Sequence, residues 1–282
     1  MAQAILAWWY SNNLLEVWID LTGLAVVFYF IPKLANRELH SHYLALFAYW
    51  FLVLFASWGG IPATAPVPAW MPTISTVATW FLILPVLAVA LNAYRTMGRV
   101  ALIAPGNPAL SFVLVGVAAF IVAGLLQALV ALFDLHHVLH FTWFAIARSQ
   151  LQFYGFFAMV LFGAIYYILP QIIGLEFQSA RLLRAHLWLA LAGILLCFAP
   201  LAVGGVVQGI QLQNPGIPFV NLMKTSLTFL RVSTLGDLLL LLGHMVFAGN
   251  VIGLTVRFYR SRATAAYAVA TADLFKTAEA KT

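Results

Sequence analysis

ALSFVLVGVAAFIVAGLLQALVALF, residues 109–133, is the stretch that decides the fold. It contains no Lys, Arg, Asp or Glu, and a helix needs about 20 apolar residues to cross the roughly 30 Å hydrocarbon core of a bilayer. Six further apolar runs have comparable lengths, at residues 14–31, 42–59, 71–93, 143–169, 185–208 and 232–256. The sequence therefore predicts an all-α, polytopic membrane protein with seven transmembrane helices.

The composition agrees with this prediction. The chain is 64% hydrophobic and only 8% charged, whereas about 25% of the residues of a soluble domain are charged. The net charge of +6 is thus interpreted as a signal of membrane topology, and no nucleic-acid partner is expected. The single cysteine, Cys197, lies inside an apolar run, which excludes a disulfide framework and a site with several Cys ligands. The first residues lack a basic segment and a clear cleavage site, so we expect the first run to be retained as a helix.

Lys and Arg residues fall in every second connection between the runs. They follow the first, third, fifth and seventh runs, and the connections at 60–70 and 134–142 contain none. Only Lys224 and Arg231 oppose this pattern. The positive-inside rule then predicts a periplasmic N-terminus and a cytoplasmic C-terminus. Residues 1–262 are expected to form one transmembrane domain, and residues 263–282 a cytoplasmic tail that is either a short surface helix or disordered.

Short motifs punctuate these runs in a recognisable order. Trp8-Trp9-Tyr10 is followed one run later by FYFIPK at residues 28–33, then by GAIYYILP at 163–170, HLWLA at 186–190 and GGVVQG at 204–209. In this order the motifs resemble helices six, ten and eleven of the catalytic subunit I of cbb3-type haem-copper cytochrome c oxidases. The last run, with Gly236-Asp237 and Gly249-Asn250, resembles helix twelve. The resemblance implies a half-fold, the C-terminal half of a twelve-helix subunit, in a bacterial inner membrane.

The same resemblance implies that the metal ligands of that family are missing from this chain. In the family, Trp-Trp-Tyr is followed by Gly-His-Asn, whose His binds copper, a later His-His pair completes the copper site, and a His-Val-His sequence binds both haems. In this chain the corresponding positions hold Asn, Pro, Ala, Arg and Gln, and these side chains do not replace imidazole in these roles. No cofactor is therefore expected in this chain by itself. The positions of the lost ligands are Asn12, Pro62 and Ala63 for copper and Arg148 and Gln150 for haem.

Four histidines are candidate replacement ligands. His136, His137 and His140 cluster in the outer connection between the fourth and fifth runs, and His244 lies inside the seventh. Neutral imidazole is a common metal or haem ligand, and His136 and His140 would share one face of a helix. The alternatives are interfacial side chains for the cluster and an interhelical hydrogen bond for His244. His186 begins a run and is interpreted as an interfacial residue.

Ionisable and amide side chains inside the runs form a second group of candidates. Such groups are costly in lipid and usually face protein or water. Glu16 and Asp20 are four residues apart and share a helix face. An ion pair between Arg148 and an acid, which would fill the emptied haem volume, is the structural interpretation, and a remnant proton path is the functional one. Gln152 and Asp237 complete this set.

Three functions remain open at this point. The first is a degenerate, non-catalytic scaffold subunit of a respiratory complex, bound to a chain that carries the missing helices or to a second copy of itself. The second is a split haem-copper oxidase, active with a partner chain, that transfers electrons to oxygen and translocates protons. The third is a transporter with an unrelated seven-helix fold. The missing ligands favour the first over the second, and the ordered motifs favour both over the third.

Overall fold

The computed structural model describes residues 2–98, 104 and 106–279. Within these residues helices are the only regular secondary structure, which confirms the all-α prediction. Six helical segments are long and apolar enough to cross a membrane. Their bounds are Ala2–Ala35, Trp70–Met97, Pro108–Val130, Trp143–Ile173, Ala180–Leu212 and Phe219–Val269.

Several of these segments are composite. The first consists of α1 (Ala2–Asn12), a π-helical stretch η1 (Asn13–Ile19) and α2 (Asp20–Ala35). The fourth has the same construction, because a π-helical stretch interrupts it near its middle. Its parts are α8 (Trp143–Gln150), η2 (Leu151–Ala158) and α9 (Met159–Ile173). The remaining helices are α3 (His42–Ala56), α4 (Trp70–Phe81), α5 (Ile83–Met97), α6 (Pro108–Val130), α7 (Phe133–Leu139), α10 (Ala180–Leu212) and α11 (Phe219–Glu279).

Helix α3 is shorter than the run that predicted it. Its 15 residues extend about 22 Å at 1.5 Å per residue, less than the thickness of the hydrocarbon core. The helix ends at Ala56 because Gly59-Gly60-Ile61-Pro62 follows, in which Gly60 has a φ of +92° and the proline lacks an N–H group. Six of the seven predicted runs are thus full-length spans, and α3 is an apolar helix of shorter reach.

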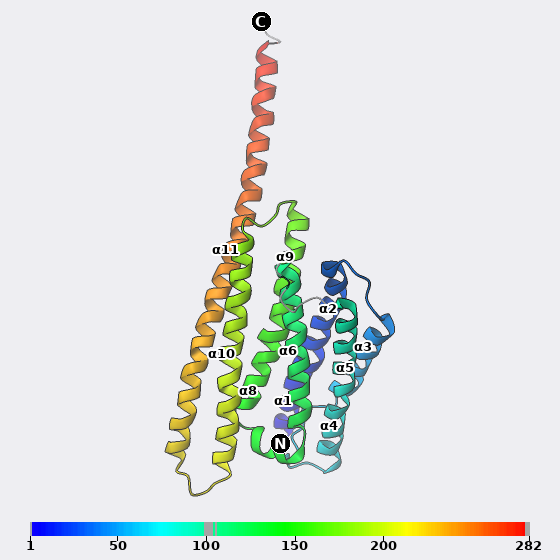
Figure 1. The fold of residues 1–282 in the computed structure, drawn as a ribbon, viewed down its shortest axis with the longest axis vertical. Coiled ribbons are helices and arrows are strands. Elements are labelled where there is room, and N and C mark those ends of the chain that lie inside the picture. Colours follow the sequence, from blue (N-terminus) through cyan, green and yellow to red (C-terminus); the bar gives the residue numbers. More distant parts are fainter. Residues whose placement is uncertain (1, 99–103, 105, 280–282) are drawn as a thin grey trace.

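Helix α6 lies in the middle of the bundle, between the α10–α11 pair on one side and α3 to α5 on the other (Figure 1). In its most apolar stretch 67% of the residues are buried, against 22% for α11 at the edge. The side chain of Asn107 accepts a hydrogen bond from Leu110 N and so caps the start of α6. The stretch of sequence that predicts the fold is therefore the helix around which the others pack.

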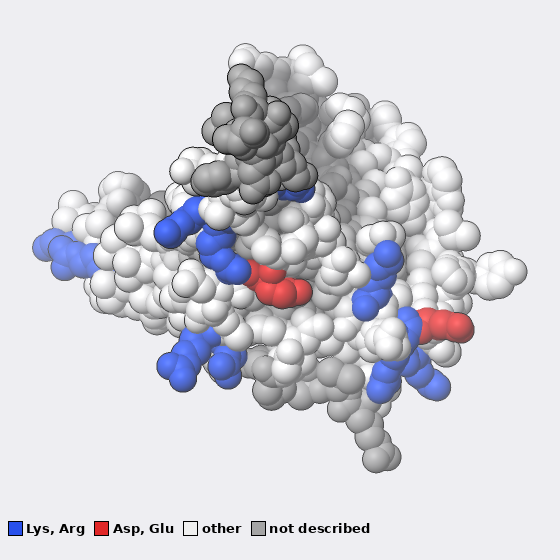
Figure 2. All heavy atoms as spheres, turned by 90° about the horizontal axis from the view of Figure 1, so that it is seen from above, with Lys and Arg blue, Asp and Glu red and all other residues white. Residues whose placement is uncertain are grey.

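Helix α11 continues well beyond the membrane-spanning part of the bundle (Figure 1). It runs to Glu279, so the boundary proposed at residue 262 falls inside one helix, and Met1 and residues 280–282 lie outside the described residues. The connection between α10 and α11 is only residues 213–218, because both helices extend beyond the predicted runs 185–208 and 232–256. Lys and Arg side chains are spread over the end from which α11 projects, with few acidic ones among them (Figure 2).

Candidate functional site

The first and fourth spans meet through their π-helical stretches, and a buried polar network joins them there. Arg148 Nη1 donates to Glu16 Oε1 over 2.8 Å and to Gln152 Oε1 over 3.3 Å. Gln152 Nε2 in turn donates to Asp20 Oδ1 over 2.9 Å. Arg148 thus pairs with one of the two acids on the first span, and Gln152 connects the pair to the second acid.

Burial makes this network energetically important. Glu16, Asp20 and Gln152 are buried, and the Arg148 side chain is only 17% exposed. A π-helical turn holds an extra residue and so changes the direction in which nearby side chains point. Glu16 lies within η1 and Gln152 within η2, so these two of the four side chains in the network leave the backbone from such widened turns.

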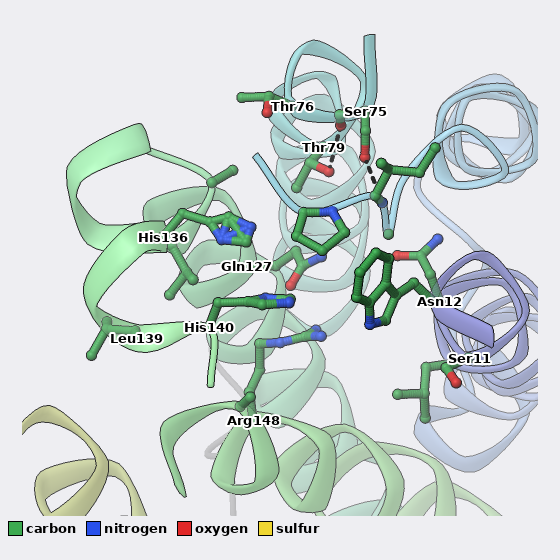
Figure 3. Close-up of a pocket in the computed structure, with 18 of the residues that line it drawn as sticks. Ser11, Asn12, Ser75, Thr76, Thr79, Gln127, His136, Leu139, His140 and Arg148 are labelled. Atoms are coloured by element: carbon green, nitrogen blue, oxygen red, sulfur yellow. Dashed lines mark hydrogen bonds between the residues drawn. The ribbon is translucent and has the colours of Figure 1, made fainter. Parts of the chain in front are cut away.

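A cavity of about 250 Å³ lies beside this network. His136, His140 and Arg148 extend into it from one side, and Asn12 lies on the opposite side (Figure 3). Helix α4 contributes hydroxyl groups, and α6 contributes one amide. The lining also includes Trp8, Ser11, Pro62, Ser75, Thr76, Thr79 and Gln127.

A much smaller void of about 10 Å³ continues from the cavity into the polar network. Gln127 and Arg148 line both spaces, and Glu16, Asp20 and Gln152 line the smaller one. A void of this size is close to the minimum that holds one water molecule, and the few polar side chains in its mainly apolar lining are the partners that such a water needs. The two acids are therefore separated from the cavity by the Arg148 and Gln127 side chains.

Two side chains at the expected metal-ligand positions, Asn12 and Arg148, are bonded to protein groups, whereas the buried Nδ1 of His136 has no hydrogen-bond partner among the described residues. Asn12 Nδ2 donates to Ala56 O over 2.8 Å. The backbone N–H of Ala63 donates to His136 Nε2 over 3.4 Å, and Pro62 offers no side-chain donor atom. Arg148 is held by Glu16.

His136 and His140 are the only two of the candidate histidines that line the cavity. Their rings lie 4.4 Å apart between centroids in an edge-to-face arrangement. Burial lowers the pKa of His140 to about 4, with smaller contributions from His136 and Arg148. Burial also lowers the pKa of His136, helped by His137. Both imidazoles are therefore neutral at pH 7.

The neutral imidazoles of His136 and His140 are in the form that binds metals, but the Arg148 guanidinium beside them disfavours a copper site. The Arg148 charge opposes a metal cation in the same cavity. Among the described residues no group of three or more His, Cys, Asp or Glu side chains is arranged to hold a metal ion. The lining of the cavity is mainly apolar, with several hydrogen-bonding side chains among it, and His136 and His140 are the two imidazoles that it contains.

The remaining predicted residues lie outside the cavity. His137 Nδ1 contacts Gln213 Nε2 over 3.3 Å at the exposed surface. Asp237 accepts a hydrogen bond from Cys197 Sγ over 2.9 Å between α10 and α11. Gln150 lines a separate groove, and His244 bonds through Nδ1 to Leu240 O in its own helix. Ala63 contributes to the site only through its backbone.

The structure corrects the interpretation of His186, which is completely buried and not interfacial. Helix α10 begins at Ala180, so His186 lies about 9 Å along the helix from its start. Its Nδ1 bonds to the Tyr166 hydroxyl over 2.9 Å, and the rings of Phe112 and Phe162 pack against it. The sequence also failed to single out Gln127, although a lone amide in the most apolar run was a usable signal.

Comparisons with known proteins agree with this fold. The chain is 27% identical over 257 residues to the cbb3-type cytochrome c oxidase subunit CcoN1 of Stutzerimonas stutzeri, an alignment that covers 88% of this chain and 54% of the relative. It is 26% identical over 258 residues to a cytochrome c oxidase subunit 1 homolog of Agrobacterium tumefaciens, with 88% and 48% covered. The chain thus spans about half the length of the curated relatives that it matches.

A haem-copper terminal oxidase dimer solved by cryo-electron microscopy shares the fold, with a TM-score of 0.74, 18% sequence identity, and 88% of this chain and 48% of that chain covered. The match removes the basis of the third alternative, a transporter with an unrelated fold. Residues 1–239 match the family described as cytochrome c and quinol oxidase polypeptide I. Because this match extends over most of its length, the chain belongs to that family and is a multi-pass membrane protein with a fold like that of subunit I.

Proposed function

We propose that the chain is a non-catalytic membrane subunit of a cytochrome c oxidase-like respiratory complex, in which it acts as a scaffold. The observation that supports this most strongly is the Arg148–Glu16 ion pair. It places a cation with a fixed partner where the family resemblance expects a haem-ligating imidazole. Asn12, at an expected copper-ligand position, likewise donates a hydrogen bond from its side-chain Nδ2 to Ala56 O.

The alternative of a split oxidase that is active with a partner chain has weaker support. It would need ligands rebuilt from the candidate histidines, and only His136 and His140 line the cavity. His137 and His244 lie elsewhere, bonded to Gln213 and Leu240. A partner would therefore have to supply most of any ligand set.

A scaffold of this kind needs other subunits. The chain spans about half the length of its relatives, whose names describe them as subunits of oxidases. The proposed partner is a membrane chain that carries the remaining helices, in the bacterial inner membrane. The second copy of this chain, considered from the sequence, is the competing partner.

The proposal predicts that the purified chain shows no haem absorption in the visible spectrum and no stoichiometric copper by elemental analysis. A catalytic cbb3-type subunit purified in parallel serves as the positive control. If the complex co-purifies with haem, the variants His136→Ala and His140→Ala should leave the spectrum unchanged, because the haem then belongs to another subunit. Copper or haem that is bound in a one-to-one ratio and lost in Asn12→Ala or His140→Ala would contradict the proposal.

The proposed orientation is a periplasmic N-terminus and a cytoplasmic C-terminus. A reporter that is active only in the cytoplasm, fused after Lys281, should be active, and the same reporter fused after Gln213 should be inactive. These positions lie beyond α11 and in the α10–α11 connection, at opposite ends of the long last helix. Activity of the second fusion alone would reverse the orientation.

A further inference from the structure

A groove of about 400 Å³ runs along the surface of the fourth span, next to the cavity, with which it shares Leu15, Ala145 and Ser149. One wall comes from η1 and the other from α8 and η2. It lies at the level of the apolar helices, so lipid or another protein must cover it. The lining residues are Leu15, Ala145, Ile146, Ser149, Gln150, Phe153 and Tyr154.

The groove contains polar groups that the described part of the chain does not satisfy. The side-chain amide of Gln150 and the hydroxyl of Tyr154 are half-buried and make no hydrogen bond to described residues. Ser149 uses its hydroxyl on Ala145 O one turn back. In hydrocarbon an amide without a partner costs several kcal/mol, so lipid tails are a poor cover for this surface.

His244 extends the polar surface beyond the groove. Its ring packs edge-to-face on Tyr154, with 6.3 Å between the centroids. Nδ1 is engaged with Leu240 O, which makes Nδ1 the protonated nitrogen and leaves the Nε2 lone pair as an acceptor. Gln150, Tyr154 and His244 therefore form a stripe of one amide, one hydroxyl and one imidazole acceptor, which we call the Gln150 stripe.

A protein partner fits this stripe better than the alternatives. Side chains that hydrogen-bond across helices are the usual polar contacts between transmembrane helices. The relatives contain about as much chain again as this protein, and that additional chain must pack against some face of this half. Trp18, one turn along η1 from Leu15, is 71% exposed and adds a large apolar contact beside the groove.

We propose that the Gln150 stripe is the docking site for a transmembrane helix of the companion chain, which presents hydrogen-bonding side chains to Gln150 and Tyr154. This inference rests on the proposed function, because it assumes a companion subunit. It goes further by assigning the face and the chemistry of the contact. Two of the residues that line the groove, Ala145 and Ser149, are small, and small side chains let a neighbouring helix approach closely.

The test uses a photo-crosslinking residue, p-benzoylphenylalanine, at Ile146 or Phe153 in the full chain in native membranes. Matched controls carry it at Leu87 on α5 or Leu195 on α10, which do not line the groove. The four side chains are between 41 and 55% exposed. We expect a discrete adduct from the groove positions alone, mapped by peptide mass spectrometry to a transmembrane helix of a different polytopic protein.

A second variant tests the polar contact. Gln150→Leu with Tyr154→Phe should lower the amount of co-purified companion about three- to tenfold, while the thermal stability of the isolated chain stays unchanged, because interhelical hydrogen bonds in membranes are individually modest. An adduct with the mass of two copies of the 31.0 kDa chain would overturn the companion as occupant. Adducts from the control positions alone, or none from the groove, would overturn the docking face. A companion that co-purifies but cross-links elsewhere leaves the proposed function intact and refutes only this inference.

Discussion

Arg148→Met is expected to lower the free energy of unfolding by about 3–5 kcal/mol, because the substitution leaves the buried carboxyl group of Glu16 without its partner. The loss should also loosen Gln152, which accepts a hydrogen bond from the same Arg148 nitrogen. The measurement is denaturant or thermal unfolding of the protein in mild detergent, together with its yield in the membrane. Wild-type yield and stability would contradict a structural role for the pair.

The matched double variant separates the cost of an orphaned charge from the net value of the pair. Glu16→Gln with Arg148→Met replaces both charges, and most of the lost stability should return, since a buried ion pair is often no better than neutral side chains of similar size. Arg231→Met is the control for removing a positive charge, because Arg231 is exposed. If the double variant were as unstable as Arg148→Met, the ion pair itself would carry a net stabilisation.

Hydropathy predicts much of this architecture because a membrane helix must satisfy its own backbone. All seven apolar runs are helical. Helix α3 is too short for a full span because local turn residues end it, and α10 and α11 extend beyond their runs. The pairing of Arg148 with an intramembrane acid also follows from cost alone, because charges in lipid need partners, but the choice of Glu16 over Asp20 and Asp237 does not. These features depend on residue types and their positions along the chain, which the sequence contains.

The hydropathy pattern does not reveal features that depend on helix register or on how deep a residue lies in the bundle. The π-helical stretches η1 and η2 have ordinary apolar sequences around Glu16 and Gln152, and nothing in the hydropathy marks the extra residue per turn. The burial of His186 follows from where Ser179 caps α10, which a run of apolar residues does not reveal. The cavity needs residues from the first four membrane-spanning segments, from α7 and from the loop before α4 at one depth, so only the tertiary structure assembles it.

Gly205→Val is expected to destabilise the protein by about 3 kcal/mol or more, at the upper end of the range for overpacking. A Cβ at Gly205 would overlap the backbone nitrogen and Cα of Phe144 on α8, and backbone atoms cannot move aside as a flexible side chain can. Trp143 N donates to Gln208 Oε1 over 3.0 Å one turn further along α10, which fixes the two helices at this short distance. The measurement is again unfolding in detergent.

The effect should extend to the polar network. Helix α8 also carries Arg148, so a displacement of α8 by the new side chain moves the guanidinium away from Glu16. Gly249→Val is the control, because nothing lies within 4 Å of its Cβ position and the helix-propensity change from Gly to Val is the same in both variants. The Gly205 variant should therefore add little further loss when it is combined with Arg148→Met, whereas fully additive losses would show that α8 stays in place and that the two contacts are independent.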